Sequence, residues 1–323
     1  MRSPTHTSKS RALAAMFALL LFIIALEAAS GDQQTWQGAW RGQGSDADIA
    51  HLQHGRAQQH CLSKGELSER LDFSSRLRSR IILGLPDPWL RQLSDFDRGA
   101  RLRTVAPVNT RQFLHFASRA ALEWRADEIA EWTIQVQRLS RAARGLNVRL
   151  PPVYLVKTTG AEEFDSAYTR GRAIVIPQRL ASLAVADQRR AFFLLAHELF
   201  HVLSRMNPAQ REALYSLLGF ERVGGFDYPE ELEATRLSNP DAFEYSHALQ
   251  VQSTTGPVDV LPVNQSRLPL AEAILLPSIF EALDIVLLAV DGETGEVQRD
   301  AGGELVRYHF GNTSWPPQMA RNS

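Results

Sequence analysis

The most constraining feature of this chain is the run Ala-Phe-Phe-Leu-Leu-Ala-His-Glu-Leu-Phe-His-Val-Leu at positions 191–203, whose ionisable residues are His197, Glu198 and His201. On a helix the two histidines differ by roughly 40° around the axis, and Glu198 lies within about 100° of both. An ionised carboxylate on an apolar helix is costly unless it is paired or lies near a metal. The run therefore predicts a buried helix that turns two imidazoles and one carboxylate toward a single metal ion.

The flanks of this run predict where the helix begins and ends. Asp187 is a suitable N-cap, and Asn207 precedes Pro208, which disfavours helical backbone at the residue before it. Arg205 falls in the last turn, where a cation suits the helix dipole.

The order His-Glu-x-x-His has a known chemistry. Neutral imidazole is a common zinc ligand, and the glutamate takes a proton from a water that the metal activates. We therefore expect His197 and His201 to bind Zn²⁺, Glu198 to act as general base, and a peptide or protein to be the substrate. The structural alternative is two core histidines and a solvated glutamate. Weaker candidates for stabilising an oxyanion are Tyr228, Tyr245 and His247.

A catalytic zinc site needs three protein ligands and an open position, and the third ligand is not evident. No His-x-x-Gly-x-x-His continuation follows the motif, which excludes the metzincin pattern. The candidates are Glu230, Glu231, Glu233 and Glu281, with Asp241 and His247 also available. Each has an ordinary explanation, because glutamates favour the first turn of a helix and Asn-Pro-Asp commonly forms a turn.

The remaining pattern predicts an α+β fold. Helical periodicity covers about 46–79 and 110–144, and short strands are indicated at 152–157 and 171–177, with a turn over 168–171. We expect three parts: residues 1–30, a mostly helical region over 31–145, and a metal-binding region over 146–323 whose small sheet packs on the helix with the two histidines.

The first thirty residues are typical of an export signal. Arg2, Lys9 and Arg11 precede an apolar run over 12–26, and Ala28-Ala29-Ser30 offers small residues for cleavage. We expect a secreted or periplasmic protein; the alternative is an uncleaved N-terminal membrane anchor. The net charge of −1 favours no nucleic-acid partner, and the single cysteine allows no intramolecular disulfide.

The stretch from Ala196 to Arg205 resembles gluzincin metallopeptidases, the zincin branch whose third ligand is a glutamate. That resemblance implies a zincin-like fold, in which an edge strand lies along the cleft above the metal helix and an extended substrate adds to it. Residues 173–176 are the expected edge strand.

A longer resemblance, over about residues 150–314, is to an uncharacterised group of exported bacterial H-E-x-x-H proteins. It rests on the segments Tyr168-Thr-Arg-Gly, His197–Arg205, Leu218-Gly-Phe and Asn239-Pro-Asp-Ala. In that group a His-Pro-Glu-Glu-Ile-Leu-Ala helix follows an Asn-Thr turn and could supply the third ligand. Here Asn312-Thr313 is followed by Ser-Trp-Pro-Pro-Gln-Met-Ala-Arg-Asn-Ser. The resemblance therefore implies that the ligand-bearing helix is missing and that activity is in question.

Overall fold

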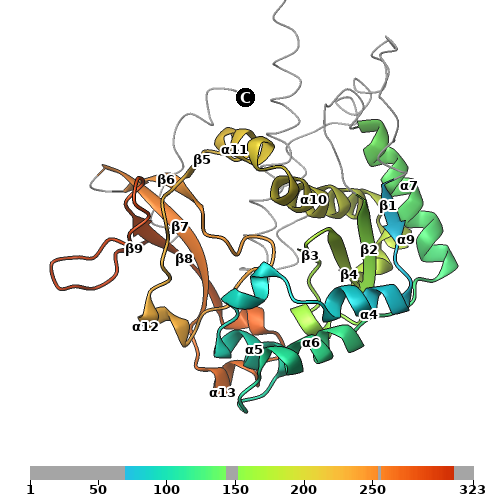
Figure 1. The fold of residues 1–323 in the computed structure, drawn as a ribbon, viewed down its shortest axis with the longest axis horizontal. Coiled ribbons are helices and arrows are strands. Elements are labelled where there is room, and N and C mark those ends of the chain that lie inside the picture. Colours follow the sequence, from blue (N-terminus) through green and yellow to red (C-terminus); the bar gives the residue numbers. More distant parts are fainter. Residues whose placement is uncertain (1–69, 143–151, 254–255, 309–323) are drawn as a thin grey trace, which may run out of the picture.

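The computed structural model describes residues 70–142, 152–253 and 256–308, and it contains both helices and small sheets. Two sheets lie side by side, and the long helix α10 (Gln188–Met206) crosses above the first of them (Figure 1). The α+β class expected from the sequence is confirmed. Within the described ranges, no helix combines the length and apolar character needed to span a membrane.

The first sheet has the strand order β1-β2-β4-β3. Strands β1 (Leu71–Phe73), β2 (Val153–Thr158) and β4 (Ala173–Pro177) are parallel, whereas β3 (Tyr168–Arg170) runs antiparallel to β4. The register pairs Leu155 with Ile174, and β3 folds back onto β4 through a turn at Gly171.

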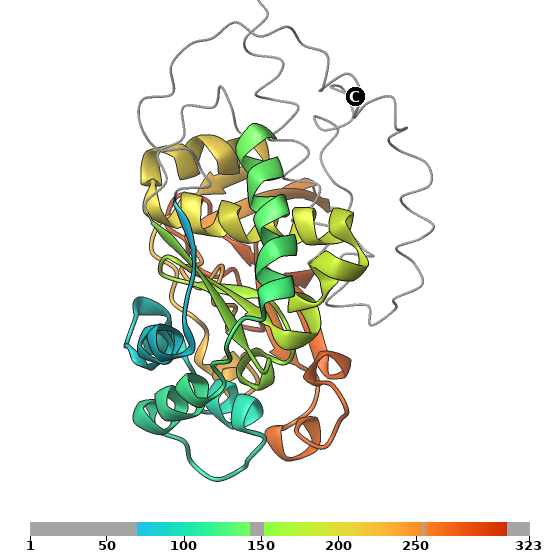
Figure 2. The same ribbon diagram turned by 90° about the vertical axis from the view of Figure 1, so that its right-hand side faces the viewer.

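Helices cover both faces of this sheet, as the end-on view shows (Figure 2). The helices of the N-terminal part of the described chain are α4 (Arg76–Gly84), η2 (Pro88–Gln92), α5 (Asp95–Leu102), α6 (Thr110–Arg119) and α7 (Ala126–Ala142). The helices between β2 and β5 are η3 (Ala161–Glu163), α8 (Gln178–Ala181), α9 (Leu183–Ala186), α10 and α11 (Pro208–Leu217).

The continuous apolar sequence of β4 reflects burial on both of its faces. Ile174 and Ile176 point into a core shared with α7, α9 and α10, while Ala173 and Val175 point into a second core that includes Leu83 of α4. Because successive side chains of a strand alternate between faces, a strand covered on both sides must be apolar throughout.

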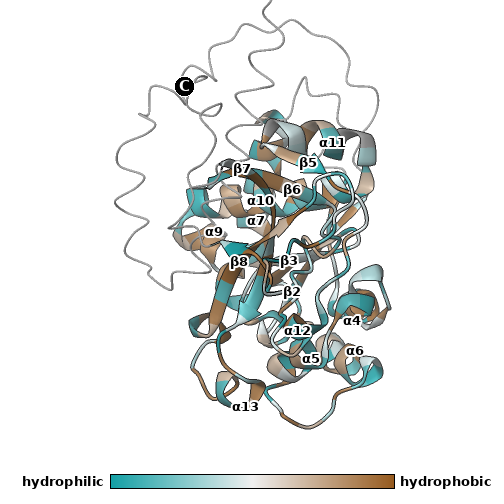
Figure 3. Cartoon of the chain, turned by 90° about the vertical axis from the view of Figure 1, so that its left-hand side faces the viewer, coloured by the Kyte–Doolittle hydropathy of each residue, from teal (hydrophilic) through white to brown (hydrophobic). Residues whose placement is uncertain are grey.

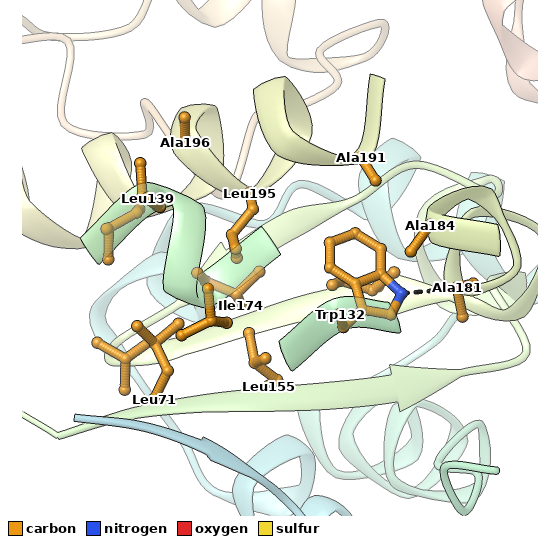
Figure 4. Packing of buried hydrophobic residues seen from close by; sticks show 14 of the residues in the cluster. Leu71, Trp132, Leu139, Leu155, Ile174, Ala181, Ala184, Ala191, Leu195 and Ala196 are labelled. Carbon is orange, nitrogen blue, oxygen red and sulfur yellow. Dashed lines mark hydrogen bonds between the residues drawn. The ribbon is translucent and has the colours of Figure 1, made fainter. Parts of the chain in front are cut away.

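Residues 70–142 contribute to the same core as the histidine-bearing helix. Strand β1 pairs with β2, and Trp132 of α7 is fully buried against α8 and α9. Its indole nitrogen donates to the carbonyl oxygen of Ala181, the last residue of α8, at 2.8 Å (Figure 4). Leu195 of α10 lies in the same cluster, beside Ile174 of the sheet.

The second sheet is antiparallel, with the order β5-β6-β7-β8-β9. Its strands are β5 (Phe220–Arg222), β6 (His247–Ser253), β7 (Gly256–Ser266), β8 (Leu283–Val290) and β9 (Arg307–Tyr308). Short helical turns lie beside it at α12 (Glu230–Glu233), α13 (Leu270–Ala273) and η4 (Ile279–Glu281). Figure 3 shows brown, hydrophobic stretches on β7 and β8 and mixed colours on α11.

Two local expectations are wrong. Residues 71–73, expected to be helical, form β1, because their backbone pairs with β2. Residues 168–170, expected to be a turn, form β3, and only Gly171 and Arg172 turn the chain.

The edge strand is therefore not the one expected from the sequence. Residues 173–176 lie in β4, which has β2 on one side and β3 on the other, so β3 forms this edge of the sheet.

The fully buried Leu195 tests the packing of α10 on the sheet. We expect Leu195→Ala to lower the free energy of unfolding by about 2–5 kcal/mol, because it removes apolar contacts and leaves a cavity. Urea denaturation measures the change. The matched control is Leu77→Ala on α4, whose side chain is 71% exposed and whose loss is expected to cost less than about 0.5 kcal/mol. Equal losses in the two variants would contradict this packing.

Candidate metal centre

Helix α10 begins and ends where the sequence predicts. The side chain of Asp187 accepts a hydrogen bond from the amide of Arg190, and α11 begins at Pro208. Leu195 and Leu199 face the first sheet, so His197 and His201 project from the side of α10 turned away from that sheet. Both imidazoles are buried, at 9% and 8% exposure.

The two imidazoles converge on one point. The Nε2 atoms of His197 and His201 lie 3.1 Å apart, and the ring planes are inclined by 81°. Two zinc–nitrogen bonds of about 2.05 Å would span 3.1 Å at an angle of roughly 100°, close to the tetrahedral value. The Nε2 separation therefore fits two ligands of one zinc ion.

The protonation state of the histidines also fits a metal. Burial lowers the pKa of both imidazoles to about 3; the neighbouring His201 adds to the effect on His197, and Arg205 adds to the effect on His201. Neutral imidazoles are the form that binds a metal. Neither buried Nδ1 atom has a hydrogen-bond partner among the described residues.

Glu198 is the third polar group of this helix segment, and it is 2% exposed. Burial raises its pKa well above the usual range, Asp241 raises it further, and Arg205 opposes them. Its Oε2 atom is buried and finds no hydrogen-bond partner in the described part of the chain. Burying a carboxylate without a partner costs free energy, and a cation bound nearby would reduce that cost.

Arg205 ties the helix to the edge strand and to the loop that contains Asp241. Its guanidinium donates to the carbonyl oxygens of Gly171 and Pro240, at 3.2 and 3.1 Å, and to the hydroxyl of Thr169 at 3.0 Å. The Oδ1 atom of Asp241 accepts from the amide of Thr169 at 2.8 Å and from its hydroxyl at 2.5 Å. Seven residues separate Arg205 from Glu198, so they lie on nearly the same face of α10.

The four glutamates expected as third ligands are not brought to the histidines. Glu231 pairs with Arg299 at 2.7 Å and Glu233 with Arg236 at 3.1 Å, while Glu230 is exposed. Helix α12, which carries them, lies at the opposite end of the molecule from α10 (Figure 1). Glu281 belongs to η4, beside β8 of the second sheet. No cluster of three or more potential metal-ligating side chains is present in residues 70–142, 152–253 and 256–308.

The candidates for oxyanion stabilisation are used elsewhere in the fold. Tyr228 and Tyr245 pack against each other, with ring centroids 5.7 Å apart, in the core of the second sheet. His247 is hydrogen-bonded to Ser246 and to Glu212, and it contacts the ring of Tyr215 at 4.6 Å.

The comparisons with known proteins leave the site to be judged on its own geometry. No protein-family model, no curated protein and no solved structure gives a significant match to this chain.

The sequence did not single out Thr169 or the contact between Arg205 and the loop at 239–241. The segments Tyr168–Gly171, His197–Arg205 and Asn239–Ala242 were recognisable as separate motifs, and the structure brings them together. Hydrogen bonds between residues about 35 and 72 positions apart leave no periodic signal in a sequence.

The lowered histidine pKa values predict a pH dependence in metal-free protein. Unfolded histidine titrates near pH 6.5, so between about pH 6.5 and pH 3 the unfolded chain binds more protons than the folded one. This contribution to stability is fully present above pH 6.5 and is lost as the pH falls toward 3. Urea denaturation across this range should show a steeper loss for the native chain than for the double variant His197→Gln/His201→Gln. Parallel curves would contradict the assignment of the low pKa values to these residues.

Proposed function

We propose that this chain is an exported zinc metallopeptidase that hydrolyses peptide bonds of a peptide or protein substrate. The observation that carries the proposal is the 3.1 Å separation of the Nε2 atoms of His197 and His201, with Glu198 on the next residue of the same helix. Two converging neutral imidazoles and an adjacent buried carboxyl supply two of the three zinc ligands and the general base that zinc-dependent hydrolysis uses.

Each of the three residues has a distinct role in this proposal. His197 and His201 hold Zn²⁺, a Lewis acid that activates water and polarises the scissile carbonyl. Glu198 orients the attacking water and accepts its proton at a carboxylate oxygen, then delivers that proton to the leaving amine. Its burial excludes bulk water, which strengthens these electrostatic interactions.

The fold we propose to be zincin-like is the first sheet together with α10. Three features support this: a sheet packed on the helix with the two histidines, an edge strand β3 antiparallel to β4, and contact between β3 and that helix. The export signal at residues 1–30 and the alternative N-terminal anchor lie outside the described residues, and both remain proposals.

A second function is favoured by one observation. The described residues assemble no three-ligand group around the two imidazoles. A degenerate zincin that binds a metal or a partner in the cell envelope without hydrolysis would need only His197 and His201. Zinc content together with turnover of a peptide mixture separates the two functions, because the second predicts bound zinc without turnover.

Glu198→Gln is the decisive variant for hydrolysis. We expect it to keep bound zinc and to lose peptidase activity at least about 100-fold, because an amide cannot accept the proton. His197→Ala and His201→Ala should lose the zinc itself. Zinc content by mass spectrometry and cleavage of a fluorogenic peptide library measure the two properties.

The control is Glu272→Gln, which removes an exposed carboxylate on α13 and should change neither property. A purified native protein that does not bind added zinc would overturn the proposal. Equal activity in Glu198→Gln and the native chain would also overturn it.

A further inference from the structure

Two imidazoles and one base leave the proposed zinc site short of a ligand and short of negative charge. Arg205 places a cation on the same side of α10, where its charge helps to lower the pKa of His201. A dication beside a guanidinium needs a compensating carboxylate within a few ångströms. Among the described residues, this role requires a carboxylate that lies on the histidine side of α10.

Asp241 is that carboxylate. Its charge opposes the lowering of the pKa of His197 and adds to the raising of the pKa of Glu198, so it acts on the metal-binding side of α10. Geometry independent of these effects places it there as well. Its Oδ1 atom is bonded to Thr169 on β3, and Arg205, one turn beyond His201, holds both the Thr169 hydroxyl and the carbonyl of Pro240.

One end of this loop is anchored much more firmly than Asp241 itself. The amide and hydroxyl of Ser238 donate to Oδ1 of Asp97, and the carbonyl of Ser238 accepts from Arg101. Arg101 is fully buried and makes a bidentate ion pair with Glu163. Asp241, three residues further on, is only partly buried, and no described residue donates a hydrogen bond to its Oδ2 atom. A side-chain rotation can therefore redirect this carboxylate while the backbone of the loop stays in place.

The hydrogen bond between the Thr169 amide and Asp241 also affects the edge of the first sheet. Because Arg170 pairs with Ala173 across the two-residue turn, Thr169 is the position of β3 whose amide points away from β4. That amide is where an extended peptide would add to the edge of the sheet. Its hydrogen bond to Asp241 occupies this position.

We propose that Asp241 is the third zinc ligand and that its carboxylate exchanges between Thr169 and the metal. In the metal-free chain it caps the edge strand; in the zinc form it binds the metal beside His197 and His201 and releases the Thr169 amide to the substrate. Metal loading and opening of the edge strand are thereby coupled. This inference rests on the proposed zinc site and goes beyond it by naming the ligand and the regulation of substrate access.

The test uses the full chain and Zn²⁺ alone. Isothermal titration compares the native protein with Asp241→Asn, which keeps an oxygen acceptor for Thr169 but removes the charge and is a poor zinc ligand. Zinc affinity should fall at least about 100-fold, beyond the range typical of residues that only orient a ligand. The matched control Glu231→Gln, which neutralises a sequence-predicted candidate paired with Arg299, should leave affinity unchanged.

Hydrogen exchange of the Thr169 amide in the native protein provides a readout that needs no variant. Zinc should speed this exchange about tenfold, the scale expected for loss of one hydrogen bond. If zinc binds through His197 but neither Asp241→Asn nor amide exchange responds, the inference fails and the proposed function stands. If the native protein binds no zinc, both fail.

Discussion

The rest of the structure depends on the burial of one helix. The middle turns of α10, from Leu195 to Val202, are buried, although His197, Glu198 and His201 lie among them. Burial keeps the imidazoles neutral and leaves the carboxyl unpaired, so the same packing that stabilises the fold prepares the polar groups for a cation. Strand β4 beneath it is apolar on both faces, which fits a strand that is buried on both sides.

A second, polar framework fixes what surrounds that helix. The buried group formed by Asp97, Arg101 and Glu163 holds Ser238, and Trp89 donates to the hydroxyl of the same serine. Removing one partner of such a group leaves an uncompensated buried charge, at a typical cost of about 3–5 kcal/mol. The framework thus positions the loop that ends at Asp241. Arg205 links this loop to β3, because it donates to the carbonyl oxygen of Pro240 and to the hydroxyl of Thr169. Hydrogen bonds and ion pairs thus help to place β3 and the loop at 239–241 beside α10.

The sequence was sufficient where the physical signal is local. Capping and proline chemistry predict the helix limits at Asp187 and Pro208, and helical periodicity predicts the convergence of His197 and His201. Short apolar runs bounded by turn residues predict the strands β2 and β4. It was insufficient where pairing between distant segments decides. The strand β1 is only three residues long and exists because β2 accepts it, and the edge position of β3 follows from the order of the sheet.

By itself, the sequence determined the α+β class, the buried helix and a pair of imidazoles spaced for one metal, because these depend on the residue period of a single element. Only the tertiary structure decided which carboxylate lies near the two imidazoles. Helix α12 and its glutamates lie at the far end of the molecule, whereas Asp241 is held at the edge strand beside α10. The physical reason is that the position of a loop depends on hydrogen bonds and ion pairs to distant residues such as Thr169, Arg205 and Arg101. Spacing along the chain carries no information about those contacts.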